Sequence, residues 1–378
     1  MMQRMAALVA EHWEDLMRST RCKALAVGVL ALTVAVATVA LPAHAQTPVR
    51  VGWCTKAVTS ATSPWAIAMK LGLIEKAGLS LTVLPTAGSA DCMKLVATRD
   101  YLLALSGIEA LATMREQGVK VKIFYTAYRN YIFGIKVPAD SPIKTVADLK
   151  GKKIGVNSMA SNGVIVTRAM AANAGLDPQK DINIVVAGEG AQAAAQIKNK
   201  QVDAYSAFDT AYVLVENAGV PLRDLPNPNA TKFPSAGMYA LEESIASKRK
   251  DLVSLGQAFA KGQIFAMANP EAAVRILWEL FPQTKPTGID EATALDNEIK
   301  VLNARAAAWS LDADKLGIKR WGESVGLNYQ TYYDWLLEQK VIKQKLDAKD
   351  IFTNELIDDI NKFDPAEVAA MAKAYKAK

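Results

Sequence analysis

Histidine is almost missing from this chain of 378 residues: only His12 and His44 occur, and both precede residue 46. If the first 45 residues are removed, as argued below, no histidine remains. The chain then lacks the usual general base at neutral pH and the commonest ligand of transition metals. Cysteine is scarce too, and after residue 45 the sequence holds only Cys54 and Cys92. Two cysteines without histidine are too few for a zinc site, so we expect neither a metal nor a cofactor.

The sequence also lacks the charge pattern of a nucleic-acid-binding protein. The net charge is +6, and no dense block of lysine and arginine with interleaved aromatic residues occurs. No nucleophile-elbow or paired-carboxylate motif is present, so we predict that the chain is not an enzyme. Apolar residues make up 51% of the chain. This composition is typical of a globular protein with an ample core, and the length suits two ordinary domains.

The first 45 residues have the order of a secretory signal peptide. Three basic residues precede an uncharged apolar run over residues 24–41, and Ala43-His44-Ala45 follows as the small-x-small pattern before a cleavage site. We expect cleavage before Gln46. The alternative is an uncleaved anchor, because the run is close to spanning length. Residues 11–15 are acidic and do not suit a leader, so we interpret residues 1–16 as an upstream start-site artefact.

The two remaining cysteines predict a disulfide, because secreted chains fold in an oxidising compartment. Two buried free thiols are the alternative. Cys54 ends the first predicted strand, and Cys92 lies in the helix after the second. A bond between them would brace two neighbouring loops.

Strand and helix signals alternate through most of the chain. Strands are predicted over residues 48–53, 79–85, 101–105 and 119–128, with helices between them. Ser106, followed by Glu109, has the spacing of a capping box for one of these helices. The pattern restarts with strands predicted over residues 132–137, 153–156, 182–186, 202–207 and 222–225. Such alternation predicts mostly parallel sheets with helices on both faces. One more strand and a mostly helical segment follow from Met238.

Four stretches carry a family resemblance. They are AIAMKLGLIEKAGL (66–79), LALSGIEALATM (103–114), DSPIKTVADLKGKKIGV (140–156) and ANPEAA (268–273). In this order they resemble the NMT1/SsuA-like group of ABC-importer solute-binding proteins, which take taurine, nitrate, sulfonates or thiamine precursors. The resemblance implies an α/β protein of the two-lobed type II periplasmic-binding-protein fold. Each lobe would be a mostly parallel sheet flanked by helices, with a helical C-terminal extension.

The same resemblance implies the domain limits and the partners. Lobe 1 would comprise residues 46–131 plus 233–378, and lobe 2 residues 132–232. The protein would be a periplasmic monomer that captures a small polar or anionic organic solute. It would deliver this solute to ABC permease and ATPase subunits at the inner membrane.

Ligands of open α/β sheets bind beyond the carboxyl ends of the strands, where helix N-termini offer free N–H groups. The loops at those ends supply five candidate ligand-binding residues: Ser89, Ser106, Ser158, Ser161 and Asn162. Helix capping is the alternative role of the serines. Glu189 and Asp209 are predicted to contact an amine or hydroxyl of the ligand, or to cap helices instead.

Further candidates lie at the first crossover between lobes and among the aromatic residues. Arg129 and Asn130 are predicted to contact a carboxylate or sulfonate, although Arg129 could instead form a salt bridge at the hinge. Trp53, Trp65 and Phe208 are predicted to cover an apolar ligand body, with core packing as the alternative.

Two other functions stay open at the level of the sequence. A protein of this fold can signal to a membrane sensor instead of feeding a permease. Some relatives make the pyrimidine of thiamine with a histidine and a CCxFC cluster, and residues 46–378 contain neither. No motif in the sequence identifies the ligand.

Overall fold

The structure is a computed structural model that describes residues 46–227, 233–309, 318–324 and 329–377. The predicted signal peptide lies outside the described residues. Residues 47–378 form one unit. Within the described part, no helix combines the length and the apolar character that a membrane crossing requires.

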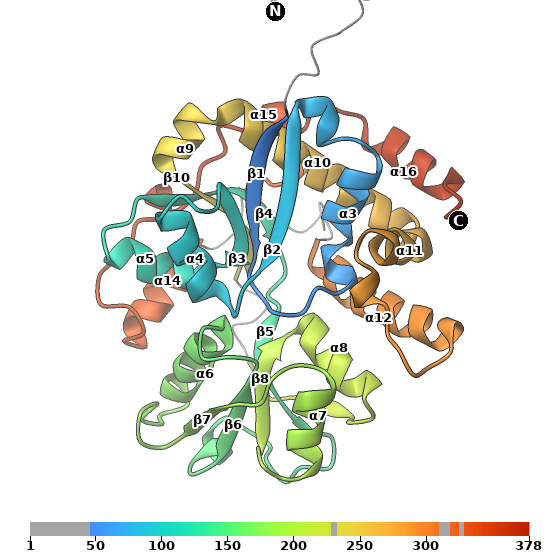
Figure 1. Cartoon of the computed structure of the whole chain (residues 1–378). Coiled ribbons are helices and arrows are strands. Elements are labelled where there is room, and N and C mark those ends of the chain that lie inside the picture. Colours follow the sequence, from blue (N-terminus) through green and yellow to red (C-terminus); the bar gives the residue numbers. More distant parts are fainter. Residues whose placement is uncertain (1–45, 228–232, 310–317, 325–328, 378) are drawn as a thin grey trace, which may run out of the picture. The chain divides into compact units, whose positions relative to one another are not determined.

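Among the described residues, two five-stranded sheets organise this unit (Figure 1). The first has the strand order β2-β1-β3-β10-β4. Its strands are β1 (Thr47–Trp53), β2 (Leu79–Pro85), β3 (Leu103–Gly107), β4 (Val121–Tyr128) and β10 (Ala236–Leu241). β1 pairs in parallel with β2 and β3, whereas β10 runs antiparallel between β3 and β4.

The second sheet repeats this design with the order β7-β6-β8-β5-β9. Its strands are β5 (Phe133–Pro138), β6 (Lys153–Val156), β7 (Asn183–Val186), β8 (Ala204–Phe208) and β9 (Leu222–Asp224). β6 is parallel to β7 and β8, and β5 is antiparallel to β8 and β9.

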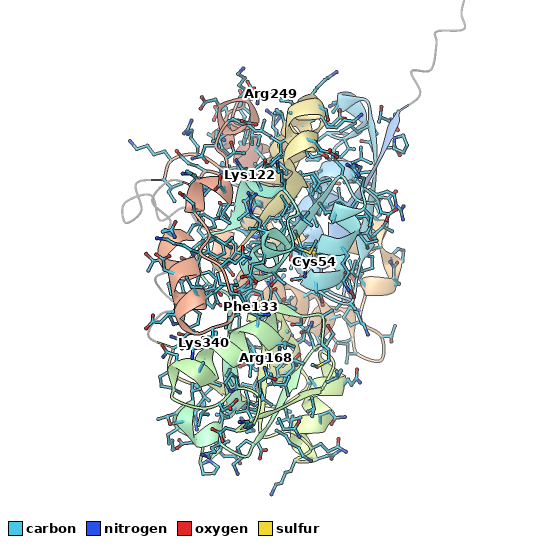
Figure 2. All side chains as sticks on the ribbon, turned by 90° about the vertical axis from the view of Figure 1, so that its left-hand side faces the viewer. Cys54, Lys122, Phe133, Arg168, Arg249 and Lys340 are labelled. Carbon is cyan, nitrogen blue, oxygen red and sulfur yellow. A yellow bond between two sulfur atoms is a disulfide. The ribbon has the colours of Figure 1, made fainter. Side chains whose placement is uncertain are left out.

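The chain passes between the sheets twice. It leaves the first sheet after Tyr128 and enters the second at Phe133, then returns between Asp224 and Ala236. The first strand after each passage, β5 or β10, is the one that runs antiparallel to its neighbours. Figure 2 shows Phe133 at the level where the two halves meet. The predicted two-lobed α/β fold is therefore confirmed. We call the half around the first sheet lobe 1 and the other lobe 2; the exact residue limits given above stay a prediction.

Helices flank both sheets. Lobe 2 carries α6 (Asn162–Asn173), α7 (Ala191–Lys198) and α8 (Asp209–Asn217). Lobe 1 carries α3 (Ser63–Lys70), α4 (Ser89–Ala97), α5 (Ile108–Glu116), α9 (Glu242–Ser247), α10 (Arg249–Ala268), α11 (Pro270–Leu280), α12 (Glu291–Trp309), α14 (Tyr329–Glu338), α15 (Ile357–Ile360) and α16 (Pro365–Ala374). Short 3-10 turns lie at Ser60–Thr62, Glu75–Ala77, Ala147–Leu149, Pro282–Thr284 and Ala348–Asp350. The C-terminal helices pack on lobe 1, as predicted (Figure 1).

Local sequence explains several helix starts. The side chain of Ser161 caps α6 by accepting a hydrogen bond from the Gly163 amide, 2.9 Å away. Asn269 caps α11 in the same way, and Pro270 follows in the first turn, where a missing N–H costs nothing.

The predicted capping box at Ser106 is wrong. β3 extends to Gly107, which is the N-cap of α5, and no side chain caps this helix. The Ser106 hydroxyl is buried without a hydrogen-bond partner among the described residues. Glu109 is buried as well and contacts other side chains instead, because two tyrosines and an asparagine lie within reach of its carboxylate.

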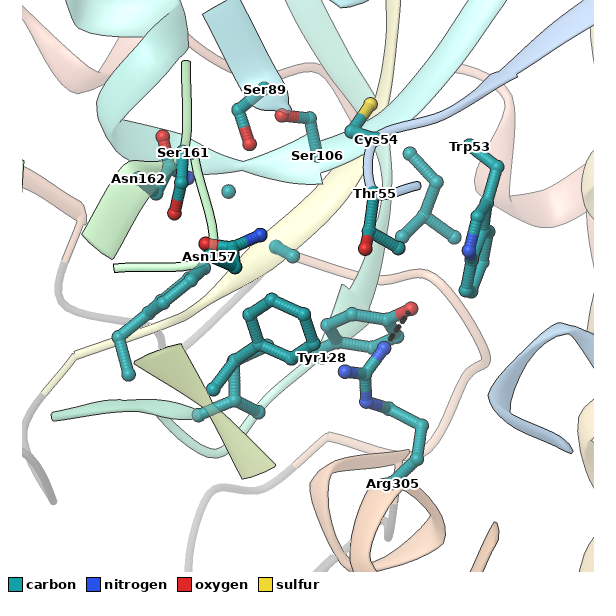
Figure 3. Close-up of a pocket in the computed structure, with 16 residues that line it drawn as sticks. Trp53, Cys54, Thr55, Ser89, Ser106, Tyr128, Asn157, Ser161, Asn162 and Arg305 are labelled. Carbon is teal, nitrogen blue, oxygen red and sulfur yellow. Dashed lines mark hydrogen bonds between the residues drawn. The ribbon is translucent and has the colours of Figure 1, made fainter. Parts of the chain in front are cut away.

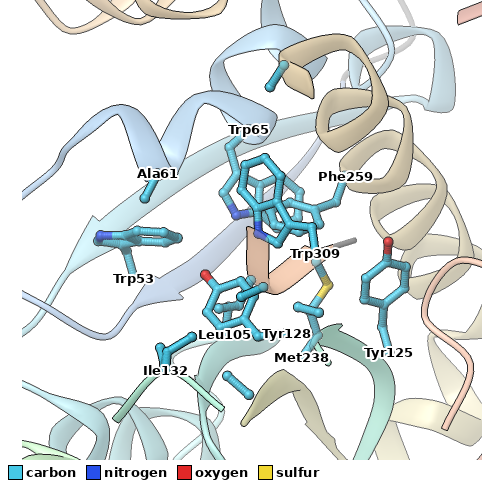
Figure 4. Packing of buried hydrophobic residues seen from close by; sticks show 14 of the residues in the cluster. Trp53, Ala61, Trp65, Leu105, Tyr125, Tyr128, Ile132, Met238, Phe259 and Trp309 are labelled. Atoms are coloured by element: carbon cyan, nitrogen blue, oxygen red, sulfur yellow. The ribbon is translucent and has the colours of Figure 1, made fainter. Parts of the chain in front are cut away.

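The main core of lobe 1 lies between the first sheet and helices α3, α10 and α12. Trp65, Phe259 and Trp309 are fully buried there (Figure 4). The rings of Trp65 and Phe259 are 4.8 Å apart, centroid to centroid. A Cβ added at Gly262 would lie 2.2 Å from the Pro64 carbonyl oxygen, so α10 approaches α3 as closely as only glycine permits. This close packing holds α3 against α10 at the end of the loop that follows β1.

Candidate functional site

A cavity, partly open to solvent, lies where the two lobes face each other. Both lobes supply its walls (Figure 3). Its lining residues are Trp53, Cys54, Thr55, Ser89, Leu105, Ser106, Gly107, Tyr128, Ile132, Phe133, Asn157, Ser161, Asn162, Phe208, Ala236 and Arg305.

Four helices begin at this cavity. Ser89 starts α4, Gly107 precedes α5, Ser161 precedes α6 and Phe208 precedes α8, and all four residues line the walls. The first N–H groups of a helix have no partner within the helix and carry partial positive charge. Helix ends from both lobes therefore converge on one space, and together they favour an electron-rich group there.

Polar contacts join the lobes around the cavity. The Thr55 hydroxyl of lobe 1 donates to Glu189 Oε1 of lobe 2 over 2.7 Å. The Ala90 amide donates to the Ala160 carbonyl oxygen over 3.1 Å, and the Ser158 hydroxyl donates to the Ala87 carbonyl. The lobes therefore contact each other directly at the rim of the cavity.

Two glycines permit this close approach. A Cβ at Gly88 would lie 2.5 Å from the Ala160 carbonyl oxygen, and one at Gly107 would lie 1.6 Å from Asn162 Nδ2. Each glycine is in lobe 1 and each obstructed atom in lobe 2. A side chain at either position would push the lobes apart.

Glu109 lies beneath the cavity wall at the lobe boundary. Its side chain accepts hydrogen bonds from Tyr131 (3.0 Å), from Tyr332 and from Asn162 Nδ2 (2.9 Å). Burial raises the pKa of the Glu109 carboxyl to about 7, although the tyrosine hydroxyls partly oppose this shift. The residue is therefore a buried acceptor shared by both lobes.

Arg305 of α12 is the cation of the cavity wall. Its Nε and Nη2 atoms donate to the two carboxylate oxygens of Asp209, over 2.8 and 2.6 Å, and Nη1 donates to the Tyr128 hydroxyl over 2.7 Å. Burial alone would lower the pKa of Arg305, but Asp209 and Tyr128 raise it above its ordinary value. The guanidinium stacks over the Tyr128 ring, 4.3 Å from its centroid. Its charge is thus already balanced by lobe 2.

The predicted disulfide is present. Cys54 and Cys92 are bonded, with their Cα atoms 5.6 Å apart. The bond ties the end of β1 to the first turn of α4, so it joins the loop that carries Thr55 to the helix that begins at Ser89. Both segments line the cavity.

Comparison with known proteins identifies the family. The model of the NMT1/THI5 like family matches residues 60–273, more than half of the chain. The chain belongs to this family. The match confirms the resemblance seen in the sequence. A comparison with curated protein sequences finds no match.

Solved structures share the fold of this NMT1/THI5 like protein. A protein of Bordetella bronchiseptica is 19% identical with a TM-score of 0.63; the alignment covers 84% of this chain and 98% of that one. The alkanesulfonate-binding protein SsuA of Xanthomonas axonopodis, solved with MOPS, is 18% identical with a TM-score of 0.60, covering 81% and 99%. The periplasmic nitrate-binding protein NrtA of Synechocystis is 16% identical with a TM-score of 0.56, covering 88% and 99%.

Half of the predicted ligand-binding residues line the cavity of this family member. They are Trp53, Ser89, Ser106, Ser161, Asn162 and Phe208. Whether they touch a ligand stays a prediction. Three of the six come from lobe 1 and three from lobe 2, so the structure brings loops from both sheets to one place, as the strand-end argument requires.

The other six predicted residues lie outside the cavity lining. Trp65 is fully buried in the core, Arg129 donates to the carbonyls of Arg320 and Glu323, and Asn130 donates to the Ala307 carbonyl. The remaining three residues, all in lobe 2, form hydrogen bonds with lobe 1: Ser158 with Ala87, Glu189 with Thr55 and Asp209 with Arg305. Glu189 also accepts a hydrogen bond from Asn157 within lobe 2.

Sequence reasoning missed Arg305, Tyr128 and Asn157. Asn157 directly follows β6, so its position at a strand end was a usable signal. Tyr128 ends β4 at the crossover. Nothing local marks Arg305, which lies 96 residues after its partner Asp209 and on the other lobe. In the described residues, no group of three or more His, Cys, Asp or Glu could hold a metal ion.

Proposed function

We propose that this protein is the periplasmic substrate-binding component of an ABC importer, and that it captures one small polar or anionic organic solute between its lobes. The observation that carries the proposal is the cavity between the two sheets, on which four helix N-termini from both lobes converge. In such a site the two lobes close on the solute, because each lobe alone supplies only part of the contacts to it.

The walls suggest how the solute lies. Polar groups gather on the side of Ser89, Ser106 and Asn162, whereas the Tyr128 ring lies on the opposite side (Figure 3). Phe133 and Phe208 add further aromatic rings to the lining. An electron-rich group of the solute would face the helix ends, and an apolar or aromatic body would lie against the rings. Because Arg305 is paired with Asp209, the helix ends and hydroxyls supply most of the attraction for an anion.

No residue of the cavity suggests catalysis. Its lining contains no histidine, and the cysteine in it is bonded to Cys92. We therefore propose a protein that releases its solute unchanged to a permease, with a cytoplasmic ATPase as the second partner. The solved periplasmic nitrate-binding protein with this fold supports a periplasmic location after removal of the predicted leader. We also propose that the protein acts as a monomer.

Two alternative functions would use the same cavity. A membrane sensor could read the closed form in place of a permease, and neighbouring genes for a permease and ATPase or for a sensor kinase would separate these roles. Synthesis of the thiamine pyrimidine would need a histidine and a cysteine cluster, and the described residues contain no histidine.

The experiment is a thermal-shift screen of the full chain, expressed and purified in its secreted form. The panel contains taurine and alkanesulfonates, nitrate, bicarbonate, aminopyrimidines, and aliphatic and aromatic acids. A solute at 100 times its dissociation constant stabilises the folded state by about 2.7 kcal/mol, a shift of several degrees. A shift confined to one chemical class supports the proposal, and a flat response to every compound contradicts it.

A further inference from the structure

Three polar side-chain atoms of the cavity wall are buried and have no hydrogen-bond partner among the described residues. They are Ser106 Oγ, Asn157 Oδ1 and Asn162 Oδ1. Their residues are 3%, 5% and 2% exposed, so solvent hardly reaches them in the closed arrangement. A buried polar atom without a partner costs about 1–3 kcal/mol. Two of the three atoms are amide oxygens, which can only accept hydrogen bonds.

Glu109 fixes the orientation of Asn162. Asn162 Nδ2 donates to Glu109 Oε2 over 2.9 Å, while Tyr131 and Tyr332 donate to Oε1. An ionised carboxylate only accepts, so the nitrogen end of the amide must face it and the oxygen end is turned away. The amide cannot rotate to offer its nitrogen to the cavity without losing this bond across the lobes.

Glu189 fixes the orientation of the Asn157 side-chain amide in the same way. Asn157 Nδ2 donates to Glu189 Oε1 over 2.9 Å, and the Thr55 hydroxyl donates to the same oxygen over 2.7 Å. The Thr55 bond comes from lobe 1, so this orientation is completed only where the lobes meet. Asn157 Oδ1 therefore remains as the free end of its amide.

We propose that Glu109 and Glu189 are positioning residues that turn the oxygens of Asn162 and Asn157 toward the ligand, so that the bound solute presents N–H or O–H donors to this wall. The inference rests on the proposed function and deepens it by naming the ligand class. The helix N-termini donate and the two asparagine oxygens accept, so the solute carries both kinds of group. Amino or hydroxy derivatives of small organic acids fit; nitrate and plain alkanesulfonates, which have acceptors only, leave both oxygens unpaired.

Matched pairs of solutes test the proposal by titration calorimetry on the full chain at pH 8. Taurine and isethionate are compared with ethanesulfonate, and 4-aminobenzoate with benzoate. Within each pair that binds, we expect the donor-bearing member to bind about tenfold more tightly or better, because one satisfied oxygen is worth about 1.4 kcal/mol or more. Equal or tighter binding of the member that lacks the donor overturns the proposal and leaves the proposed function standing.

The positioning role has its own readout. In Glu109→Gln and Glu189→Gln, the asparagine amides are free to turn, so the affinity ratio within a pair falls toward one even if both affinities change. Glu298→Gln is the matched control, since Glu298 is a buried carboxylate that accepts from the Ser60 amide and lies outside the cavity lining. The Glu298→Gln variant should keep the wild-type affinity ratio within each solute pair. An unchanged affinity ratio in both Glu109→Gln and Glu189→Gln overturns the positioning role of these two glutamates.

If no compound of either series binds, neutron diffraction from crystals still decides the orientation. Deuterium atoms on Asn162 Nδ2 and Asn157 Nδ2 that point to Glu109 and Glu189 support the proposal. Oxygens in those places overturn it.

Discussion

At the scale of single residues, the site depends on carboxylates that never line it. Glu109 lies outside the cavity lining, yet its carboxylate accepts hydrogen bonds from Asn162 of lobe 2 and from Tyr131 and Tyr332. Its burial disfavours the ionised form that orients Asn162 best. The protein therefore holds a costly group at the lobe boundary, which is more typical of a functional site than of a core position.

Glu109 predicts a pH dependence of stability. Its pKa in the fold, about 7, lies above the ordinary value of 4.5, so the folded chain holds this proton more tightly than the unfolded chain. The unfolding free energy should therefore fall as pH rises from about 4.5 to 7, by up to about 3 kcal/mol. The surrounding tyrosines, Tyr131, Tyr239, Tyr332 and Tyr333, have pKa values well above 10 and stay neutral in this range.

Urea unfolding at pH 5 and pH 8 measures this effect. Relative to Glu109→Gln, the wild type should lose stability between the two pH values. Parallel pH profiles of the two proteins would show that Glu109 does not titrate in this window.

At the scale of elements, helix α12 and helix α8 meet across the lobes through Arg305 and Asp209. The side chains are 5% and 14% exposed, so the pair is largely removed from water. Removing one partner of a buried pair leaves an uncompensated charge, at a cost of about 3–5 kcal/mol. The pair should therefore hold the lobes together as long as both partners are present.

Asp209→Ala should open the ligand-free protein. Small-angle X-ray scattering should give a larger radius of gyration than for the wild type, because separation of the lobes returns Arg305 to water. Glu291→Ala is the control: Glu291 lies on α12 like Arg305, and the variant loses only an exposed pair with Arg275 of α11 and with Lys285, so it should scatter like the wild type. A variant at Asp209 with unchanged scattering would contradict the role of the pair.

The disulfide acts between β1 and α4. Cys54→Ser with Cys92→Ser opens a loop of 38 residues, and we expect the double variant to fold but to lose about 2–4 kcal/mol of unfolding free energy. Folding should persist because the core of lobe 1 is large. Denaturation midpoints of the oxidised protein and the double variant check this; coincident midpoints would mean that the bond does not stabilise the fold.

Most helices and strands could be predicted from the sequence because they depend on local residue patterns. Strands such as β1 and β6 and the starts of α3 and α11 follow from alternation, proline and caps. The capping box at Ser106 failed because β3 continues through Ser106 into Gly107, and Glu109 found tertiary partners. Ser161 and Asn162 were predicted correctly as residues near the cavity because they follow the end of a strand. Arg305 could not be predicted, because its position depends on how α12 packs against α8.

At the scale of the whole molecule, two sheets of the same strand order face each other over one cavity. Glycines at 88 and 107 let the lobes touch, and pairs such as Thr55 with Glu189 complete the walls only when they do. In the proposed function, binding and closure are therefore one event, and the solute is released unchanged.

The most direct test is titration calorimetry with the solute that gives the largest thermal shift, followed by recovery of that solute from the denatured complex and its mass. The account predicts one solute bound per chain and recovery of the solute unchanged. Recovery of a converted product, or a stoichiometry that requires binding outside the cavity between the lobes, would contradict a protein whose function is to capture and release.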